Sequence, residues 1–379
     1  CFLLIAVKLF FIQVVQGEQF KAQAVQVQNR YLPAEDFPRG DILDRHRRSL
    51  LSGIDNNTMP LEVYISDDKR LSIIDKNISQ VQTENLDYNN TFSVLINMRY
   101  GDDSLARHLI GHLSEGIGVN GLENIYEDYL KSEPKYLWKF VLDARGELVP
   151  YLSFEMEERD VIRSNLLLTI DKDIQAAAEN AMESYRVSGA VVVMEPHSGD
   201  LLAVASRPNY DQNLHDLKYS DTNYFNKAFS HYFPGSIFKI FVSAAVMEEG
   251  LVSISDRYTC NGAFHFNTTG LTIRCWNREG HGSINIVEAM AYSCNPSFIN
   301  MGIVLGRNNF LKYIDRLGLN NNQIIGYPQH SINRINIDYG PGKLANAALG
   351  QEGIMLTPVQ VAALLSSVAN GGYAVKPRI

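Results

Sequence analysis

The sequence predicts a mixed fold in which strands and helices occupy separate stretches of the chain. Two apolar runs rich in β-branched residues, 189–194 and 201–205, are separated by a polar turn that contains Gly199, and this pattern predicts a β-hairpin. From about residue 223 the pattern becomes helical, and no segment after Ala228 predicts a confident strand. Because an isolated hairpin is marginally stable, we expect a sheet that is only partly built from these residues, with helices against it.

The chain is long enough for two folded units. Its 379 residues exceed a typical single domain of roughly 100–200 residues. The formal net charge is −8, with 42 acidic against 34 basic residues. A dedicated nucleic-acid-binding domain is usually basic, so this charge argues against a nucleic-acid partner.

Residues 1–16 are apolar almost throughout, and Lys8 is the one charged residue among them. The segment is shorter than the about 20 apolar residues that cross a bilayer, and the chain opens without Met. We expect the last half of a transmembrane helix whose first half is missing, with a buried amphipathic helix as the alternative. Residues 17–29 are rich in Gln and Ala and predict that the helix continues into water.

The pattern changes near Asn165. Before it, residues 71–124 are polar and helix-like, which is typical of a scaffold more than of a catalytic core. After it, 166–170 predicts a short strand, and Asp171 is a suitable N-cap for a helix over 172–185.

Four cysteines leave the redox state open. Cys260 and Cys275 lie 15 positions apart in a stretch rich in Gly, Asn and Thr, where a disulfide would form in an oxidising compartment. Two unpaired thiols are the alternative. The spacing of this pair is not that of a zinc knuckle, so we expect no metal and no other cofactor.

Serine becomes a good nucleophile when a base takes its proton, and a lysine serves as that base if burial keeps its amine neutral. A Ser-x-x-Lys tetrapeptide on a helix places both side chains on one face, one turn apart. The chain contains this pattern three times, at Ser66–Lys69, Ser132–Lys135 and Ser236–Lys239.

The surroundings separate the three pairs. Two aspartates lie between Ser66 and Lys69, and a proline two residues after Ser132 disfavours a helix there. Ser236 instead follows Phe-Pro-Gly and leads into an apolar helical run, 237–246. We expect its hydroxyl at a helix N-terminus and the amine of Lys239 one turn deeper, in apolar surroundings. The alternative is a simple N-cap with Lys239 extended to solvent.

A second tripeptide supports the enzymatic interpretation. Ser293-Cys-Asn295 follows Ser236 by 57 positions, with an apolar helical run before it and Pro296 after it. A hydroxyl here would relay a proton between Lys239 and a leaving amine, and the amide of Asn295 would bind a substrate carbonyl. Ser-x-Asn also occurs at 283–285 and 331–333, without that context.

Taken together, these motifs resemble the first two of the three motifs of penicillin-binding proteins and serine β-lactamases. Further stretches resemble the class B penicillin-binding proteins in particular: Arg39-Gly-Asp-Ile-Leu-Asp-Arg45, Gly121-Leu-Glu123, Leu168-Thr-Ile-Asp171, Glu195-Pro-His-Ser-Gly-Asp200, Leu349-Gly-Gln-Glu-Gly-Ile-Met-Leu-Thr-Pro358 and Ala369-Asn-Gly-Gly372. The third motif of the family, Lys-Thr-Gly or Lys-Ser-Gly, is absent from the 379 residues. In the family it follows the stretch that matches 349–372, so we expect it beyond Ile379 and expect this stretch of chain to be inactive alone.

The resemblance implies an α+β penicillin-binding transpeptidase fold, an antiparallel sheet with helices that is incomplete here. Its expected domains are a partial transmembrane anchor over 1–16, an elongated pedestal over 17–164 and a C-terminally incomplete transpeptidase domain over 165–379. It implies an enzyme held by one span in the cytoplasmic membrane, with its catalytic domain outside, and cell-wall synthesis or division proteins as partners of the pedestal.

The resemblance also implies a chemistry. Ser236 would attack peptidoglycan stem peptides ending in D-Ala-D-Ala, Lys239 would be the base, Ser293 would assist the leaving D-alanine, and Asn295 would complete the site. β-Lactams would acylate the same serine. The alternatives are a D,D-carboxypeptidase or β-lactamase of the same fold, and a non-enzymatic β-lactam sensor or cell-wall scaffold.

Overall fold

The computed structural model describes most of the chain. The described ranges are 2–17, 29–34, 37–51, 58–65, 71–73, 91–142, 148, 155–213, 224–267, 269–321, 323–328 and 334–379. Residues 18–28, where the sequence predicts a continuing helix, and the tripeptide 331–333 lie outside them, as does the Ser66–Lys69 pair.

The chain divides into two compact units. The first consists of Cys1–Leu43, Ser49–Ser104 and Tyr126–Leu166, and the second of Asp44–Arg48, Leu105–Ile125 and Leu167–Ile379. The last change of unit, after Leu166, falls close to the change of sequence pattern near Asn165. Two short segments before that point belong to the second unit, so the division is not a single cut.

The first unit opens with helix α1, Phe2–Phe10, and the π-helical stretch η1, Phe11–Val15. Large apolar side chains on both are exposed to solvent, among them Phe2 and Val14. Within the described residues, no helix is long and apolar enough to cross a membrane.

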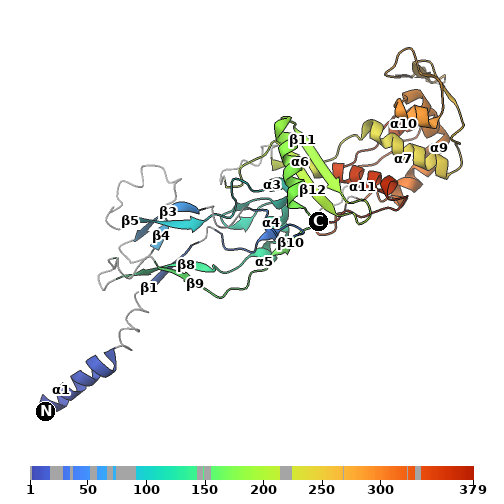
Figure 1. Ribbon diagram of the computed structural model, residues 1–379. Helices are drawn as coiled ribbons and strands as arrows, with labels where there is room; N and C mark the ends of the chain where they lie inside the picture. The colour runs from blue at the N-terminus through green and yellow to red at the C-terminus, as the bar shows by residue number, and fades with distance from the viewer. Residues whose placement is uncertain are drawn as a thin grey trace. The chain divides into compact units, whose positions relative to one another are not determined.

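Most of the described strands of the first unit form two small antiparallel sheets (Figure 1). One has the order β1-β8-β9 and the other the order β4-β3-β5. A compact core of Leu32, Val63, Val94, Ile96 and Phe140 joins their faces. The elements of the unit are β1 (Asn29–Pro33), β2 (Ile42–Leu43), β3 (Thr58–Ile65), β4 (Leu71–Ile73), β5 (Thr91–Asn97), α5 (Glu127–Leu130), β8 (Tyr136–Val141) and β9 (Glu155–Glu158); β10 (Leu166–Leu167) lies at its end.

The prediction that 71–124 is helical is wrong for most of the described part. Residues 71–73 and 91–97 are strands, and the helices of this stretch are short. In β5 the side chains of Val94 and Ile96 are buried while Leu95 between them is 56% exposed. This alternation with a period of two is that of a strand with one buried face, and the polar residues around it obscured it in the sequence.

The second unit contains the predicted hairpin, which is confirmed. Strands β11 (Gly189–Met194) and β12 (Leu201–Arg207) pair antiparallel, and Gly199 in the turn has a φ of 80°. Helix α6 (Lys172–Ser184) packs along β12, and α11 (Pro358–Ala369) packs on β11 (Figure 1). The two-stranded sheet is extended at its turn by a parallel bridge between Asp200 and Arg378.

Helices build the core around the functional residues. Helix α7 (Lys239–Glu248) packs on α9 (Asn295–Arg316), and α9 packs on α10 (Pro341–Ala348). Phe238, Phe241 and Phe298 are among the largest fully buried side chains of this core. The other elements of the unit are α3 (Arg107–Ile110), β6 (Leu113–Ser114), β7 (Ile117–Gly118), α4 (Gly121–Ile125), η5 (Lys227–Phe229), η6 (Gly235–Phe238) and α8 (Ile286–Ala291).

Four short strands follow α7, so the expectation of no strand after Ala228 is wrong. They pair as two antiparallel ladders, β13 (Tyr258–Cys260) with β16 (Gly282–Ile284), and β14 (Ala263–His265) with β15 (Thr272–Arg274). Each is three residues long, which is too short to give a periodic pattern of apolar residues. They bring residues 260 and 282 together from separate turns.

The predicted cap of α6 provides a test of local stability. The Asp171 carboxylate accepts hydrogen bonds from the backbone N–H groups of Asp173 and Ile174. We expect Asp171→Ala to destabilise the helix by about 1 kcal/mol, which accelerates hydrogen exchange of the α6 amides about fivefold. Asp171→Asn, which keeps a capping oxygen, is the matched control. Equal exchange in the wild-type and Ala proteins would contradict the cap.

Candidate active site

Ser236 and Lys239 lie on one turn at the start of α7. The turn is 3₁₀-helical, residues Gly235–Phe238, and Gly235 before the serine has a φ of 59°. Ser236 is exposed, whereas the side chain of Lys239 enters the core and is 1% exposed. The expected contrast between an accessible hydroxyl and a buried amine is therefore present, and the alternative of a solvent-extended Lys239 is excluded.

The amine of Lys239 is held by three oxygen atoms. Its Nζ donates to the backbone oxygen of Ser293 at 2.9 Å, to Ser293 Oγ at 3.0 Å and to Asn295 Oδ1 at 2.8 Å. Burial lowers the pKa of Lys239 from 10.5 to about 8, although the nearby thiols of Cys275 and Cys294 act in the opposite direction. A substantial fraction of this amine is therefore neutral near physiological pH, as a general base requires.

Ser293 links the amine of Lys239 to the turn that carries Ser236. Its Oγ accepts from Lys239 and donates to Ser236 Oγ at 3.0 Å. The residue lies between α8 and α9 and has a φ of 50°. This is a left-handed backbone conformation, which residues other than glycine adopt at a cost in free energy. Such strain is common where a side chain must be aimed at a functional group.

The hydrogen-bonded order is thus Lys239, Ser293, Ser236. The sequence placed Lys239 as the direct base of Ser236, and the hydrogen bonds between these described residues instead run through the second hydroxyl. A proton leaving Ser236 has a path through Ser293 Oγ to a neutral Lys239 Nζ. The arrangement can therefore activate an exposed alcohol.

Asn295 is oriented by a backbone group that the sequence did not indicate. While its Oδ1 accepts from Lys239, its Nδ2 donates to the backbone oxygen of Arg274, the last residue of β15, at 3.1 Å. This contact joins the start of α9 to the β14–β15 ladder. It fixes the rotamer of the amide that faces Lys239.

The segment 349–358 contacts the turn that carries Ser236 through its backbone. The Gly235 N–H donates to the oxygen of Gly350 at 2.9 Å. Gly350 has a φ of 65°, and a Cβ there would lie 2.4 Å from the Gly235 oxygen. Within the same segment, the acidic Glu352 pairs with Lys343 and accepts from Asn346. Close backbone packing between Gly350 and Gly235 therefore positions the segment.

The two other motifs that the structure describes, Ser132–Lys135 and the tripeptide 283–285, make no comparable group. Ser132 lies outside any helix, and Lys135 pairs with Glu158 at 2.9 Å. Ser283 lies in β16, and Asn285 caps α8.

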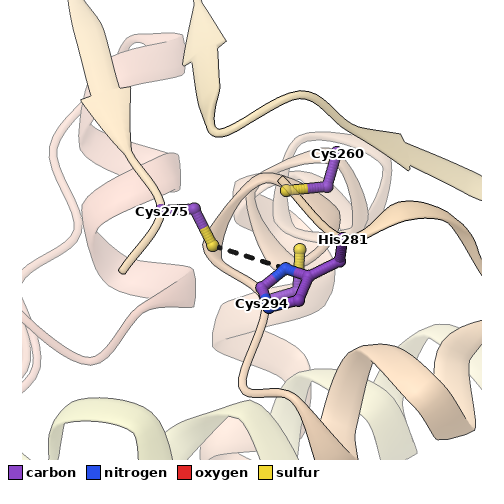
Figure 2. Close-up of side chains that lie close together, drawn as sticks. All are labelled: Cys260, Cys275, His281 and Cys294. Carbon is purple, nitrogen blue, oxygen red and sulfur yellow. Dashed lines mark hydrogen bonds between the residues drawn. The ribbon is translucent and has the colours of Figure 1, made fainter. Parts of the chain in front are cut away.

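Three thiols and an imidazole form a second cluster directly beside the serine site (Figure 2). The sulfur atoms of Cys260, Cys275 and Cys294 and a ring nitrogen of His281 all lie within 4.8 Å of one another. Cys260 and Cys275 are free thiols, so the structure has the unpaired alternative and not the disulfide. The spacing of Cys260 and Cys275 predicted no metal, but the fold brings two further donors, His281 and Cys294, to the same place.

The surroundings shift the pKa values of two of these thiols in opposite directions. Burial raises the pKa of Cys294 to about 12. At Cys260 burial acts in the same direction, but backbone N–H groups of Gly262 and His281 outweigh it and lower the pKa. Residues of this type and arrangement are those that hold zinc in proteins.

The comparisons with known proteins agree with this geometry. Residues 189–379, just over half of the chain, match the family model described as penicillin binding protein transpeptidase domain. The chain therefore belongs to the penicillin-binding protein transpeptidase family, and the resemblance to its class B members is confirmed.

Two named relatives and one solved structure give the range of similarity. The chain is 30% identical to stage V sporulation protein D of Bacillus subtilis, over 100% of this chain and 64% of the relative. It is 25% identical to peptidoglycan D,D-transpeptidase MrdA of Acinetobacter baumannii, over 69% of this chain and 42% of the relative. A structure of PBP2 in complex with MreC from Helicobacter pylori has a similar fold, with a TM-score of 0.66 and 19% identity over 92% of this chain and 78% of that chain. The chain thus spans less than two thirds of the length of both curated relatives.

The role of the contact between Gly350 and Gly235 can be tested. We expect Gly350→Ala to lower the melting temperature and to slow covalent labelling by penicillin at least about tenfold, because a Cβ at this position displaces Gly235 and with it Ser236. Gly318→Ala is the control, since Gly318 has a similar φ of 66° but open space around its Cβ. Strain at φ alone costs about 1 kcal/mol. Equal labelling by the two variants would show that the Gly235–Gly350 contact does not position Ser236.

Proposed function

We propose that the full-length protein is a peptidoglycan D,D-transpeptidase that cross-links stem peptides through an acyl-enzyme on Ser236. The observation that carries this proposal is the continuous set of hydrogen bonds from the buried amine of Lys239 through Ser293 Oγ to the exposed Ser236. The printed names of relatives such as MrdA, a peptidoglycan D,D-transpeptidase, support the same reaction.

The reaction follows from the positions of the four side chains. Ser236 Oγ attacks the carbonyl carbon of the penultimate D-alanine while its proton passes through Ser293 Oγ to neutral Lys239 Nζ. The tetrahedral intermediate collapses, the bond to the terminal D-alanine breaks, and the proton returns through Ser293 to the leaving amine. An amine from a second stem peptide then attacks the acyl-enzyme and releases Ser236. Asn295 holds Lys239 in this geometry through its Oδ1 and offers its amide to the substrate.

The first unit and the N-terminal segment have proposed roles as well. The exposed apolar side chains of Phe2–Val15 support an anchor in the cytoplasmic membrane, and we propose that residues 17–164 form the pedestal. Cell-wall synthesis or division proteins are its proposed partners, in line with the PBP2–MreC complex of similar fold. The catalytic domain would then lie outside the cytoplasm.

The 379 residues contain neither Lys-Thr-Gly nor Lys-Ser-Gly. We propose that they do not complete the cleft alone, since a cationic group for the substrate carboxylate and part of the oxyanion hole are expected from that motif. The experiments on activity therefore use the full-length protein.

The nucleophile is tested by covalent labelling. We expect Ser236→Ala to abolish the adduct with a fluorescent penicillin, seen by gel and by intact mass, because no other described hydroxyl pairs with the Lys239 amine through Ser293. Ser132→Ala, which changes another Ser-x-x-Lys pair, should label normally. An adduct that persists in Ser236→Ala would refute the assignment.

Product formation separates the alternatives. Incubation with lipid-linked precursor should give cross-linked peptide. Labelling with release of D-alanine but no cross-link would indicate a D,D-carboxypeptidase, and fast turnover of the penicillin a β-lactamase. Labelling with neither product would indicate a β-lactam sensor, and absence of labelling a scaffold.

The base is tested by the pH dependence of acylation. Only the neutral form of Lys239 accepts a proton, and its pKa is about 8. The rate of acylation by benzylpenicillin should therefore rise about tenfold per pH unit below pH 8 and level off above it. Lys239→Arg, which stays charged, should be inactive throughout. A rate that is independent of pH between about pH 6 and about pH 9 would contradict the role of Lys239.

A further inference from the structure

A pocket of about 420 Å³ lies within the first unit, and its wall is basic. Separate stretches of the chain form it: 37–41, 49–51, 97–99, 135–136 and 161–165. The cations on its wall are Arg39, Arg99, Lys135 and Arg163. Among the described residues that line it, Asp41 carries the one carboxylate. The pocket therefore presents more positive than negative side chains to its contents.

Two of these cations are buried in the wall. Arg39 is 4% exposed and Arg99 is 9% exposed, and arginine is seldom buried to this extent unless it is paired. Both terminal nitrogen atoms of Arg99 donate to the backbone oxygen of Gly40 at 3.2 Å. A carbonyl group is neutral, so this contact orients the guanidinium without neutralising it. Arg99 is thus held in one orientation at the wall of the pocket.

Two glutamates compensate part of the positive charge. Arg39 Nη2 pairs with Glu127 at 2.9 Å. Lys135 Nζ pairs with Glu158 at 2.9 Å, but the side chains of this second pair are 35% and 61% exposed. An ion pair that is open to water contributes little stability. Lys135 is therefore able to exchange Glu158 for an anion in the pocket.

The carboxylate of Asp41 is engaged by neighbouring groups. Its Oδ1 accepts from the backbone N–H of Ile42 at 2.7 Å and from Ser49 Oγ at 3.0 Å. These donors stabilise the negative charge of the carboxylate. Asp41 therefore opposes the binding of an anion less than a carboxylate without donors would.

Close backbone packing joins two of the segments that form the pocket. A Cβ at Gly40 would lie 1.9 Å from the oxygen of Ser164. The backbone N–H of Asp41 also donates to Asn165 Oδ1 at 2.8 Å. Each of these two segments carries an arginine of the wall, so the spacing of the two arginines is set by the fold. A preformed arrangement of this kind lowers the cost of ordering side chains when a ligand binds.

We propose that this pocket binds a ligand that carries a phosphate group and a larger organic part. Guanidinium groups present planar sets of N–H donors that match the oxygen atoms of a phosphate, and several cations together favour a phosphate over a single carboxylate. A volume of about 420 Å³ lies within the range of small-molecule sites, about 300–1,000 Å³, so the pocket accommodates more than the phosphate. The inference is independent of the proposed reaction, because the pocket belongs to the first unit and Ser236 to the second.

Binding is tested with inorganic pyrophosphate as the probe. Calorimetric titration of the full-length protein should show saturable binding of one pyrophosphate per chain, whereas acetate at the same concentration should not bind. Arg99→Gln and Lys135→Gln should each weaken the binding of pyrophosphate at least about tenfold, because each removes a charged donor. Arg159→Gln is the matched control, since Arg159 lies over the ring of Tyr31 and does not line the pocket.

Lys135→Gln keeps the test decisive if Arg99→Gln does not fold, because the Lys135 side chain is partly exposed and its replacement leaves no buried charge behind. Ser236→Ala should bind pyrophosphate as the wild type does. Three results would overturn the inference: no binding of pyrophosphate by the wild type, equal binding of acetate, or equal weakening by Arg159→Gln and Lys135→Gln. The last result would assign the binding to diffuse surface charge.

Two further probes distinguish the sources of the phosphate. A hexose phosphate represents a sugar phosphate, and a short-chain phosphatidylglycerol below its micelle concentration represents a lipid headgroup. Each is titrated in competition with pyrophosphate, and displacement by either supports the inference and identifies the source. Failure of both to displace pyrophosphate would contradict a ligand with a larger organic part.

Discussion

The central interaction of the structure is the burial of one amine among three oxygen atoms. The Lys239 side chain is 1% exposed, and its Nζ donates to two groups of Ser293 and to Asn295 Oδ1. A buried ammonium without such partners would be strongly destabilising. With them, the cost of desolvation appears as a lowered pKa, which places the amine at the boundary between its charged and neutral forms. Structure and reactivity therefore depend on the same contacts.

The surrounding elements can be understood as supports of this group. The rings of Phe238 and Phe241 stack with their centroids 4.5 Å apart, and both side chains hold the start of α7 in the core. Gly350 supports the turn of Ser236 by direct backbone contact. On the other side, the short strands and loops between residues 258 and 284 carry three members of the thiol–imidazole cluster, and the fourth lies within the Ser293-Cys-Asn295 tripeptide itself. The Ser293-Cys-Asn295 tripeptide is thus contacted by a stretch of chain that contains little regular structure.

Much of this arrangement could be predicted from the sequence. The apolar run after Ser236 indicated a buried Lys239, and the apolar helix before Ser293 indicated a loop that faces it. The structure brings the side chains of these three residues together. Asp171 indicated the start of α6, and it caps that helix as expected. The burial of Lys239, the loop at Ser293 and the start of α6 are local features, and each depends on a pattern of about ten residues.

What the sequence did not reveal depends on contacts between distant residues. Strands of three residues show no periodicity, so β13 to β16 were missed, and with them the approach of His281 and Cys294 to Cys260 and Cys275. The order Lys239, Ser293, Ser236 depends on the rotamers of three side chains from two helix starts. In the first unit, β5 was mistaken for helix because its alternation spans only a few buried residues.

The protonation of Lys239 is the claim on which the mechanism depends, and it can be measured directly. In full-length protein with isotopically labelled lysine, the NMR signal of this side chain, assigned through Lys239→Arg, reports its titration. We expect a pKa of about 8 for Lys239, well below that of exposed lysines. A value at the ordinary 10.5 would contradict the account, because the amine would then be charged whenever Ser236 has to lose its proton.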